Sequence, residues 1–194
     1  MPDMTGKNVV VTGANSGLGF EASKAFAEKG ANVVLACRSD ARGNKAVKKI
    51  ENDDEVNDAS VEFMKLDLAD LSSIRRFAVN FKDEFSSLDV LCNNAGLMAI
   101  PRQETEDGFE MQLGVNHFGH FVLTSRLINW LVRAGENDDE KEARVVTQSS
   151  GMHERGEMDF DDLNGEEEYD KWDAYAQSKL ANVLFAYELQ RRLE

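Results

Sequence analysis

Short apolar runs alternate along the chain with longer segments whose apolar residues recur at helical spacing. The runs are rich in β-branched residues and nearly continuous, which is typical of strands buried on both faces of a sheet. We expect strands at 7–12, 32–37, 60–66, 88–92 and 143–148. We expect helices after the glycine-rich turn up to Gly30, at 40–51, from Asp70 to about Phe85, at 108–134, and from about Asp173 onward.

The alternation of strands and helices predicts an α/β fold with a doubly wound, Rossmann-like parallel sheet. A chain of 194 residues, 42% of them hydrophobic, is long enough for one well-cored domain, so we expect a single domain over residues 1–194. The apolar runs are far shorter than the roughly 20 residues of a membrane span. Cys37 and Cys92 fall near the ends of predicted strands and are interpreted as small core residues. These features predict a cytoplasmic protein with no membrane partner.

The net charge is −14, from 36 acidic and 22 basic residues. This balance argues against nucleic acid as a partner, because nucleic acid requires a basic surface. Acidic residues are dense at 135–142 and 154–173, where a solvated surface is the simplest interpretation. Acid spread this widely also suits a cytoplasm of high ionic strength, because salt screens the self-repulsion. A halophilic source is therefore a hypothesis.

The segment TGANSGLG, residues 12–19, lies between the first predicted strand and the first predicted helix. Its glycines, Gly13, Gly17 and Gly19, allow the backbone to turn sharply and approach a pyrophosphate, which a helix N-terminus then binds. Glycine clusters also occur in ordinary tight turns. The strand–turn–helix context nevertheless predicts a dinucleotide site, with the spacing G-x-x-x-G-x-G in place of the common G-x-G-x-x-G.

The end of the second predicted strand indicates which dinucleotide is bound. Many dinucleotide folds place a carboxylate there for the ribose 2′-hydroxyl. Here the strand ends in Ala36-Cys37-Arg38, and the first carboxylate is Asp40. Because a guanidinium presents a planar fork of donors, Arg38 is predicted to bind the 2′-phosphate of NADP. The alternative is a surface arginine that ends a strand.

Six motifs occur in the order found in the short-chain dehydrogenase/reductases, which the chain resembles over essentially its whole length. They are TGANSGLG at 12–19, LDLAD at 66–70, NNAG at 93–96, VNHFGHF at 115–121, VVTQSS at 145–150 and YAQSK at 175–179. Residues 93–127 are similar to the retinol dehydrogenase branch, which includes the WW-domain oxidoreductases. The resemblance implies an NADP-dependent oxidoreductase that transfers a hydride between a nicotinamide and a carbonyl or alcohol substrate.

The resemblance also implies four catalytic positions. Tyr175 matches the family's proton donor and acceptor, and Lys179 lies one helical turn later. A phenol, with a pKa near 10, exchanges protons poorly at neutral pH, and a neighbouring ammonium lowers such a pKa. Ser150 is expected to donate a hydrogen bond to the substrate carbonyl; Ser149 is the alternative that the residues alone leave open. Asn116 matches an asparagine that holds a water in a proton relay, or it is a polar group bonded inside a helix.

The family pattern further identifies the expected cofactor contacts. The loop contributes Gly13, Asn15, Ser16, Gly17, Leu18 and Gly19, and Arg38 is expected at the 2′-phosphate. Asp67 and Leu68 are expected beside the adenine, and Asn94, Ala95 and Gly96 beside the ribose and pyrophosphate. Tyr175 and Lys179 are expected to contact the cofactor as well. Asn93 is expected to brace the sheet. The histidines His117, His120 and His153 show no metal-ligand spacing with the cysteines, so we expect no metal site and interpret all three as structural or incidental.

Two departures from the family pattern matter. Residues 152–173 form a longer acidic insertion, and its scattered apolar residues either line the mouth of the pocket or form the small core of a surface lobe. Family members also continue with a sixth strand, a substrate loop and usually a seventh strand, so the sheet is expected to lack its last strands and leave the fifth at an open edge. Two functions stay open: an oxidoreductase, or a truncated, non-catalytic dinucleotide-binding fragment. The resemblance also suggests a homo-oligomer formed through 108–134 and 173–194.

Overall fold

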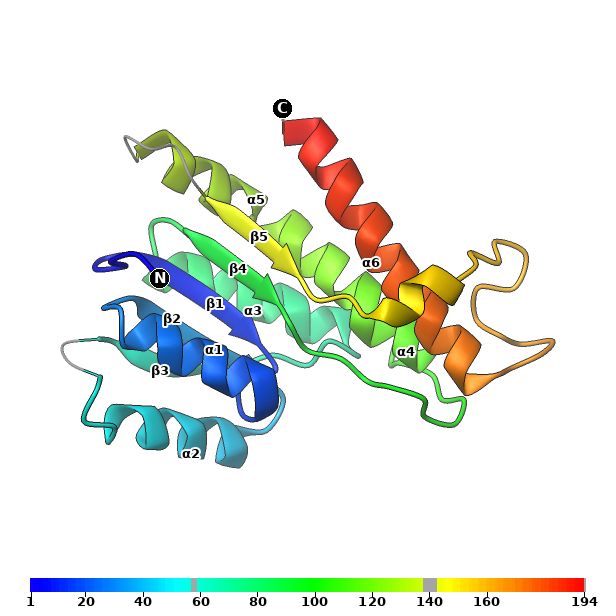
Figure 1. Cartoon of the computed structure of the whole chain (residues 1–194), viewed down its shortest axis with the longest axis horizontal. Coiled ribbons are helices and arrows are strands. Elements are labelled where there is room, and N and C mark those ends of the chain that lie inside the picture. The colour runs from blue at the N-terminus through cyan, green and yellow to red at the C-terminus, as the bar shows by residue number, and fades with distance from the viewer. Residues whose placement is uncertain (57–58, 138–142, 194) are drawn as a thin grey trace.

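The computed structural model describes residues 1–56, 59–137 and 143–193 and contains one parallel sheet (Figure 1). The strands are β1 (Asn8–Thr12), β2 (Asn32–Cys37), β3 (Val61–Lys65), β4 (Val90–Asn93) and β5 (Arg144–Thr147). Their order is β3-β2-β1-β4-β5, and every pair is parallel. The predicted doubly wound fold is confirmed, and each predicted strand is correct to within two residues at either end.

Helices cover both faces of the sheet. One face carries α1 (Gly17–Ala27) and α2 (Asp40–Glu51), and the other carries α3 (Leu71–Glu84) and α5 (Gly119–Asn137), with the last helix beside α5. Alternate residues of β1 point to opposite faces of the sheet. Val9 and Val11 pack with α1 and α2, whereas Val10 packs with α3 and α5. This alternation explains why the strands are continuous apolar runs, since both of their faces are buried.

The last helix, α6 (Lys171–Leu193), lies beside α5 (Figure 1). Phe185 of α6 packs edge-on against Phe121 of α5, with the ring centroids 5.7 Å apart. A short 3-10 helix, η2 (Gly151–Arg155), precedes the acidic segment that leads to α6. Among the described residues, β3 and β5 are the two edge strands of the sheet. No helix in the described part of the chain is both long and apolar enough to span a membrane. The acidic residues 138–142 lie outside the described ranges.

The predicted single helix over 108–134 is wrong in its details. The structure has a first turn, α4 (Met111–Leu113), then a π-helical segment, η1 (Gly114–Phe118), and then α5. The helix begins late because the Glu110 carboxylate accepts hydrogen bonds from the amides of Gln112 and Leu113 and so caps it. Periodicity cannot reveal a π segment, because one widened turn shifts the apolar pattern by a single residue.

Candidate active site

The glycine-rich loop turns from β1 into α1 at the carboxyl edge of the sheet. Gly13 and Gly17 have positive φ angles of 66° and 57°, which side chains disfavour. A Cβ at Gly19 would lie 2.7 Å from the carbonyl oxygen of Gly13, so this helix position requires glycine. Ser16 is the N-cap residue, yet its side chain makes no capping hydrogen bond, and the first turn has no acidic residue. The amide groups of that turn are therefore available to bind an anion.

A cavity of about 460 Å³ opens beside this loop, where β1 separates β2 from β4. This is the switch point at which doubly wound sheets bind ligands. The predicted cofactor residues that line it are Gly13, Asn15, Ser16, Leu18, Gly19, Arg38, Asp67, Leu68, Asn94, Ala95 and Gly96. Gly17, which starts α1, is exposed and is not among the lining residues. The structure thus brings together residues from four separate stretches of the sequence.

The cavity also shows a residue that the sequence analysis missed. Arg42 lines it together with Arg38, and both side chains are exposed. Arg42 lies in the first turn of α2, where Ser39 caps the helix by accepting a hydrogen bond from the Arg42 amide. The sequence shows the two arginines four residues apart. That spacing alone does not predict that they share a cavity, because a strand ends and a helix begins between them. The two guanidinium groups make this end of the cavity cationic.

Tyr175 and Lys179 lie on the buried side of α6, with 9% and 4% of their surfaces exposed. The Lys179 Nζ atom is 5.7 Å from the centroid of the Tyr175 ring, and it donates a hydrogen bond to the Gln148 carbonyl at 3.2 Å. Burial lowers the pKa of the Lys179 ammonium. A Cβ on Gly96 would lie 3.5 Å from this Nζ atom. Because Gly96 is also a wall of the cavity, Lys179 lies directly behind the predicted cofactor site.

Asn116 lies in the π segment, and its buried side chain makes three hydrogen bonds. Its Oδ1 atom accepts the Leu97 amide at 2.7 Å, while its Nδ2 atom donates to the Leu97 carbonyl and to the Ser178 hydroxyl, both at 2.9 Å. Ser178 in turn donates to the carbonyl of Tyr175 at 2.7 Å. The side chain therefore connects the segment after β4 to the helix that carries Tyr175. Both Nδ2 hydrogens are thus used, so a relay water near Asn116 could bond only to the second lone pair of Oδ1 or to the backbone carbonyl.

The two neighbouring serines have different surroundings. The Ser149 hydroxyl donates to the backbone carbonyl of Lys179 at 2.9 Å, so it ties β5 to α6. The Ser150 hydroxyl accepts the Met152 amide at 3.3 Å as the cap of η2, which leaves its hydrogen free to donate. This difference favours Ser150 as the donor to a substrate. Asn93 donates to Thr124 of α5 at 3.0 Å and so braces the sheet, as expected.

The apolar residues Met158, Phe160, Leu163 and Tyr169 of the acidic insertion line a cavity together with the first turns of α6. This separate cavity has a volume of about 690 Å³, and its lining includes neither Tyr175 nor Ser150. The apolar residues of the insertion form no core, and Phe160 is 77% exposed. The segment is instead held by hydrogen bonds: the Tyr169 hydroxyl contacts the Ile100 carbonyl and the Glu110 carboxylate, both at 3.1 Å.

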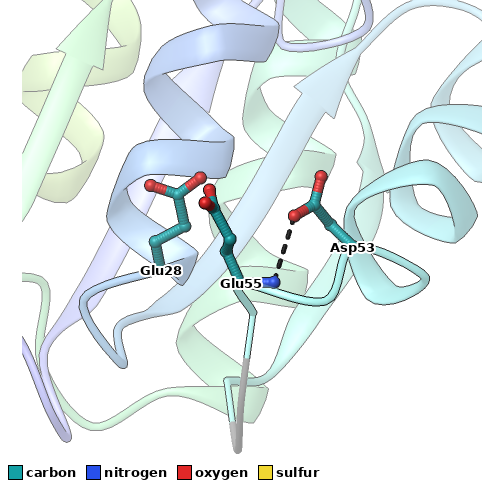
Figure 2. A group of neighbouring side chains, drawn as sticks. All are labelled: Glu28, Asp53 and Glu55. Carbon is teal, nitrogen blue, oxygen red and sulfur yellow. Dashed lines mark hydrogen bonds between the residues drawn. The ribbon is translucent and has the colours of Figure 1, made fainter.

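Three carboxylates, Glu28, Asp53 and Glu55, gather where α1 ends and where the chain leaves α2 (Figure 2). The Lys24 ammonium lies among them, 2.7 Å from Asp53, 3.4 Å from Glu28 and 3.9 Å from Glu55. Its hydrogen bond lowers the pKa of Asp53. Because a lysine already supplies the positive charge, this cluster is a surface ion-pair network.

The chain is similar to several dehydrogenases of known name. It is 46% identical to human retinol dehydrogenase 11 over 191 residues, which cover 98% of this chain and 58% of that protein. It is 42% identical to polyprenol dehydrogenase of Danio rerio over 193 residues, with 100% and 58% covered. The chain thus spans less than three fifths of the length of these relatives.

Solved structures share the fold. A protein from Mycobacterium paratuberculosis is 46% identical, with a TM-score of 0.85 over 100% of this chain and 65% of that one. RhlG of Pseudomonas aeruginosa, solved in complex with NADP, has a TM-score of 0.76 at 22% identity, with 98% and 67% covered. The sequence model of the short chain dehydrogenases matches residues 7–194. The chain therefore belongs to the short-chain dehydrogenase family, and its retinol dehydrogenase-like branch is the one that the sequence motifs indicated.

Proposed function

We propose that this chain is an NADP-dependent oxidoreductase that interconverts an alcohol and its carbonyl compound, with Tyr175 as the proton donor and acceptor. One observation carries the proposal. Gly96 is a wall of the cofactor cavity, and it also faces the Lys179 ammonium and the Asn116 side-chain oxygen, with built Cβ distances of 3.5 and 3.1 Å. The predicted cofactor site and the predicted catalytic groups therefore share one boundary.

The residues of the cavity fit a nicotinamide dinucleotide phosphate. The open first turn of α1 suits a pyrophosphate, because its amides have no capping side chain. Arg38, which follows β2, and Arg42, in the first turn of α2, suit a further phosphate, because each guanidinium can donate several hydrogen bonds to phosphate oxygens. The close contact of Gly19 with the Gly13 carbonyl leaves the backbone bare where such a ligand would approach. When bound, the nicotinamide supplies the hydride chemistry.

The remaining tasks belong to this chain's own side chains. The Ser150 hydroxyl would donate to the substrate oxygen and stabilise the negative charge that develops on it. Tyr175 would transfer the proton to or from that oxygen. The Gln148 carbonyl holds the Lys179 ammonium in place behind Tyr175. Through its bonds to Leu97 and Ser178, Asn116 connects the segment after β4 to α6, the catalytic helix that carries Tyr175 and Lys179.

The names of the relatives support an alcohol or carbonyl substrate. Retinol and polyprenol are both alcohols, and the proteins named for them are 42–46% identical to this chain. The alternative of a non-catalytic fragment has no comparable support, because all four catalytic residue types are present and Tyr175, Lys179 and Asn116 are held in buried positions.

A fluorescence titration of the chain with NADPH and with NADH tests the proposal. We expect saturable binding with NADPH preferred. Arg38→Asp should weaken NADPH binding by roughly 10- to 100-fold, which corresponds to the loss of a charge-assisted hydrogen bond, and should affect NADH far less. Arg126→Asp is the matched control: Arg126 is exposed on α5 and lies outside the cavity lining, so the same charge change there should leave both affinities unchanged.

Absence of binding of either cofactor to the unaltered chain would overturn the proposed function. Equal weakening of NADPH and NADH by Arg38→Asp would refute the phosphate-binding role of Arg38 while leaving dinucleotide binding intact.

A further inference from the structure

His120 is a fully buried histidine that the proposed reaction does not use. It lies in the first turn of α5, with 1% of its surface exposed. Its Nδ1 atom is 3.0 Å from the Asn116 backbone carbonyl, and its Nε2 atom is 2.8 Å from the Thr12 hydroxyl. The ring thus lies between the end of β1 and the π segment.

The partners of the ring fix its protonation. A carbonyl oxygen can only accept, so the hydrogen must be on Nδ1. Burial lowers the pKa of His120 to about 4, so the ring is neutral at pH 7, and Nε2 is then an acceptor. The Thr12 hydroxyl must therefore donate to Nε2.

This arrangement decides what the Thr12 oxygen can accept. With its hydrogen directed at His120, the oxygen has two lone pairs left, and the Asn94 and Ala95 amides both donate to it at 2.9 Å. Asn94 and Ala95 line the cofactor cavity. Every hydrogen-bonding position of the Thr12 hydroxyl is then used. The Cys92 carbonyl, at 3.3 Å, is a longer alternative acceptor, but that orientation would leave Nε2 of His120 without a donor.

The Nδ1 atom, on the other side of the ring, bonds to the π segment. In η1 the Gly119 amide bonds to the Gly114 carbonyl, five residues back, and Asn116 lies inside this widened turn. The bond from His120 Nδ1 holds the Asn116 carbonyl, while the Asn116 side chain reaches Leu97 and Ser178. One ring therefore contacts both Thr12, which holds the cavity-lining residues Asn94 and Ala95, and the turn that is bonded to α6.

We propose that His120 is a positioning residue that joins the cofactor cavity to the catalytic helix: its Nε2 atom orients the Thr12 hydroxyl so that Asn94 and Ala95 are held for the cofactor, and its Nδ1 atom holds the Asn116 turn. The inference rests on the proposed function, because the cavity must bind a cofactor. It gives a specific task to a histidine that the sequence analysis interpreted as structural or incidental.

The two nitrogens can be tested separately. The amide nitrogen of asparagine lies two bonds from Cβ, as Nδ1 does, and the amide oxygen of glutamine lies three bonds from Cβ, as Nε2 does. His120→Asn should therefore keep the bond to Asn116 and lose the bond to Thr12, whereas His120→Gln should do the reverse. We expect His120→Asn to raise the Kd for NADPH roughly 2- to 10-fold, the worth of one net hydrogen bond, and His120→Gln to leave it within about 2-fold.

A double-mutant cycle with Thr12→Val adds a readout that general destabilisation would not move. Once the hydroxyl is gone, His120→Asn should cause no further loss of NADPH affinity. Equal increases in Kd for His120→Asn and His120→Gln, or an effect of His120→Asn that persists in the Thr12→Val background, would overturn the inference.

A measurement on the unaltered chain covers the case in which the variants fail to fold. A long-range ¹H–¹⁵N spectrum of the histidine ring at neutral pH should show the hydrogen on Nδ1 and an unprotonated Nε2. Hydrogen on Nε2, or on both nitrogens, would overturn the inference even if NADPH binds. Failure of the unaltered chain to bind NADPH while the ring shows the expected tautomer would instead overturn the proposed function, and the cofactor role of His120 with it.

Discussion

Acidification should destabilise this protein through His120 in particular. The folded-state pKa of the ring is about 4, and an unfolded histidine titrates near 6.5. Between these values the unfolded chain binds a proton that the folded chain does not, so the free energy of unfolding falls as pH is lowered through this window and is fully retained above it. From about pH 7 to about pH 5, the two pKa values give a loss of roughly 2 kcal/mol from this one residue.

Urea unfolding at a series of pH values would measure this loss, and His120→Gln is the comparison because glutamine does not titrate. Carboxylates also contribute to the acid loss; Asp70, whose pKa is lowered by its hydrogen bond with Ser72, is one example. Their contribution is common to both proteins and cancels in the difference. The unaltered chain should therefore lose roughly 2 kcal/mol more than the variant, or about 4 to 8 °C in Tm for a chain of this size. Identical pH dependence of the two proteins would show that His120 is not buried as a neutral ring.

Three further predictions concern activity, packing and salt. Tyr175→Phe should abolish turnover and leave NADPH affinity within about 2-fold, because the lost hydroxyl handles the proton and not the cofactor phosphates; retained turnover in a carbonyl-reduction assay would refute the mechanism. Gly43→Ala should destabilise the fold by about 1 to 3 kcal/mol, because a Cβ there would overlap the ring of Phe63, whereas Gly151→Ala, with open space around its Cβ, should stay within about 0.5 kcal/mol. Melting temperature should rise from low to molar potassium chloride, because a net charge of −14 repels itself; a flat or falling curve would end the halophilic hypothesis.

The sequence predicted the features that depend on local pattern. Val9–Val11 and Val33–Leu35 are buried strands because their residues are apolar on both faces, and the amino-acid sequence shows this directly as a continuous apolar run. The glycine-rich loop was equally visible, since Gly19 is required by a contact only six residues away in the chain, with Gly13.

Features that depend on distant contacts were not predictable. The late start of the helix at Met111 depends on the carboxylate of Glu110, which is buried by the acidic insertion through Tyr169. The tautomer of His120 depends on Thr12, which is 108 residues away in sequence. Each of these follows from side-chain hydrogen bonds, and no periodicity records them.

The central position of β1 has a consequence for how the sheet can be assembled during synthesis. Each later strand joins an edge that already exists: β2 beside β1, β3 beside β2, then β4 on the free side of β1 and β5 beside β4. No strand has to be inserted between two that are already paired. Because a chain emerges from the ribosome N-terminus first, the sheet can grow outward from β1 in the order in which its strands are translated.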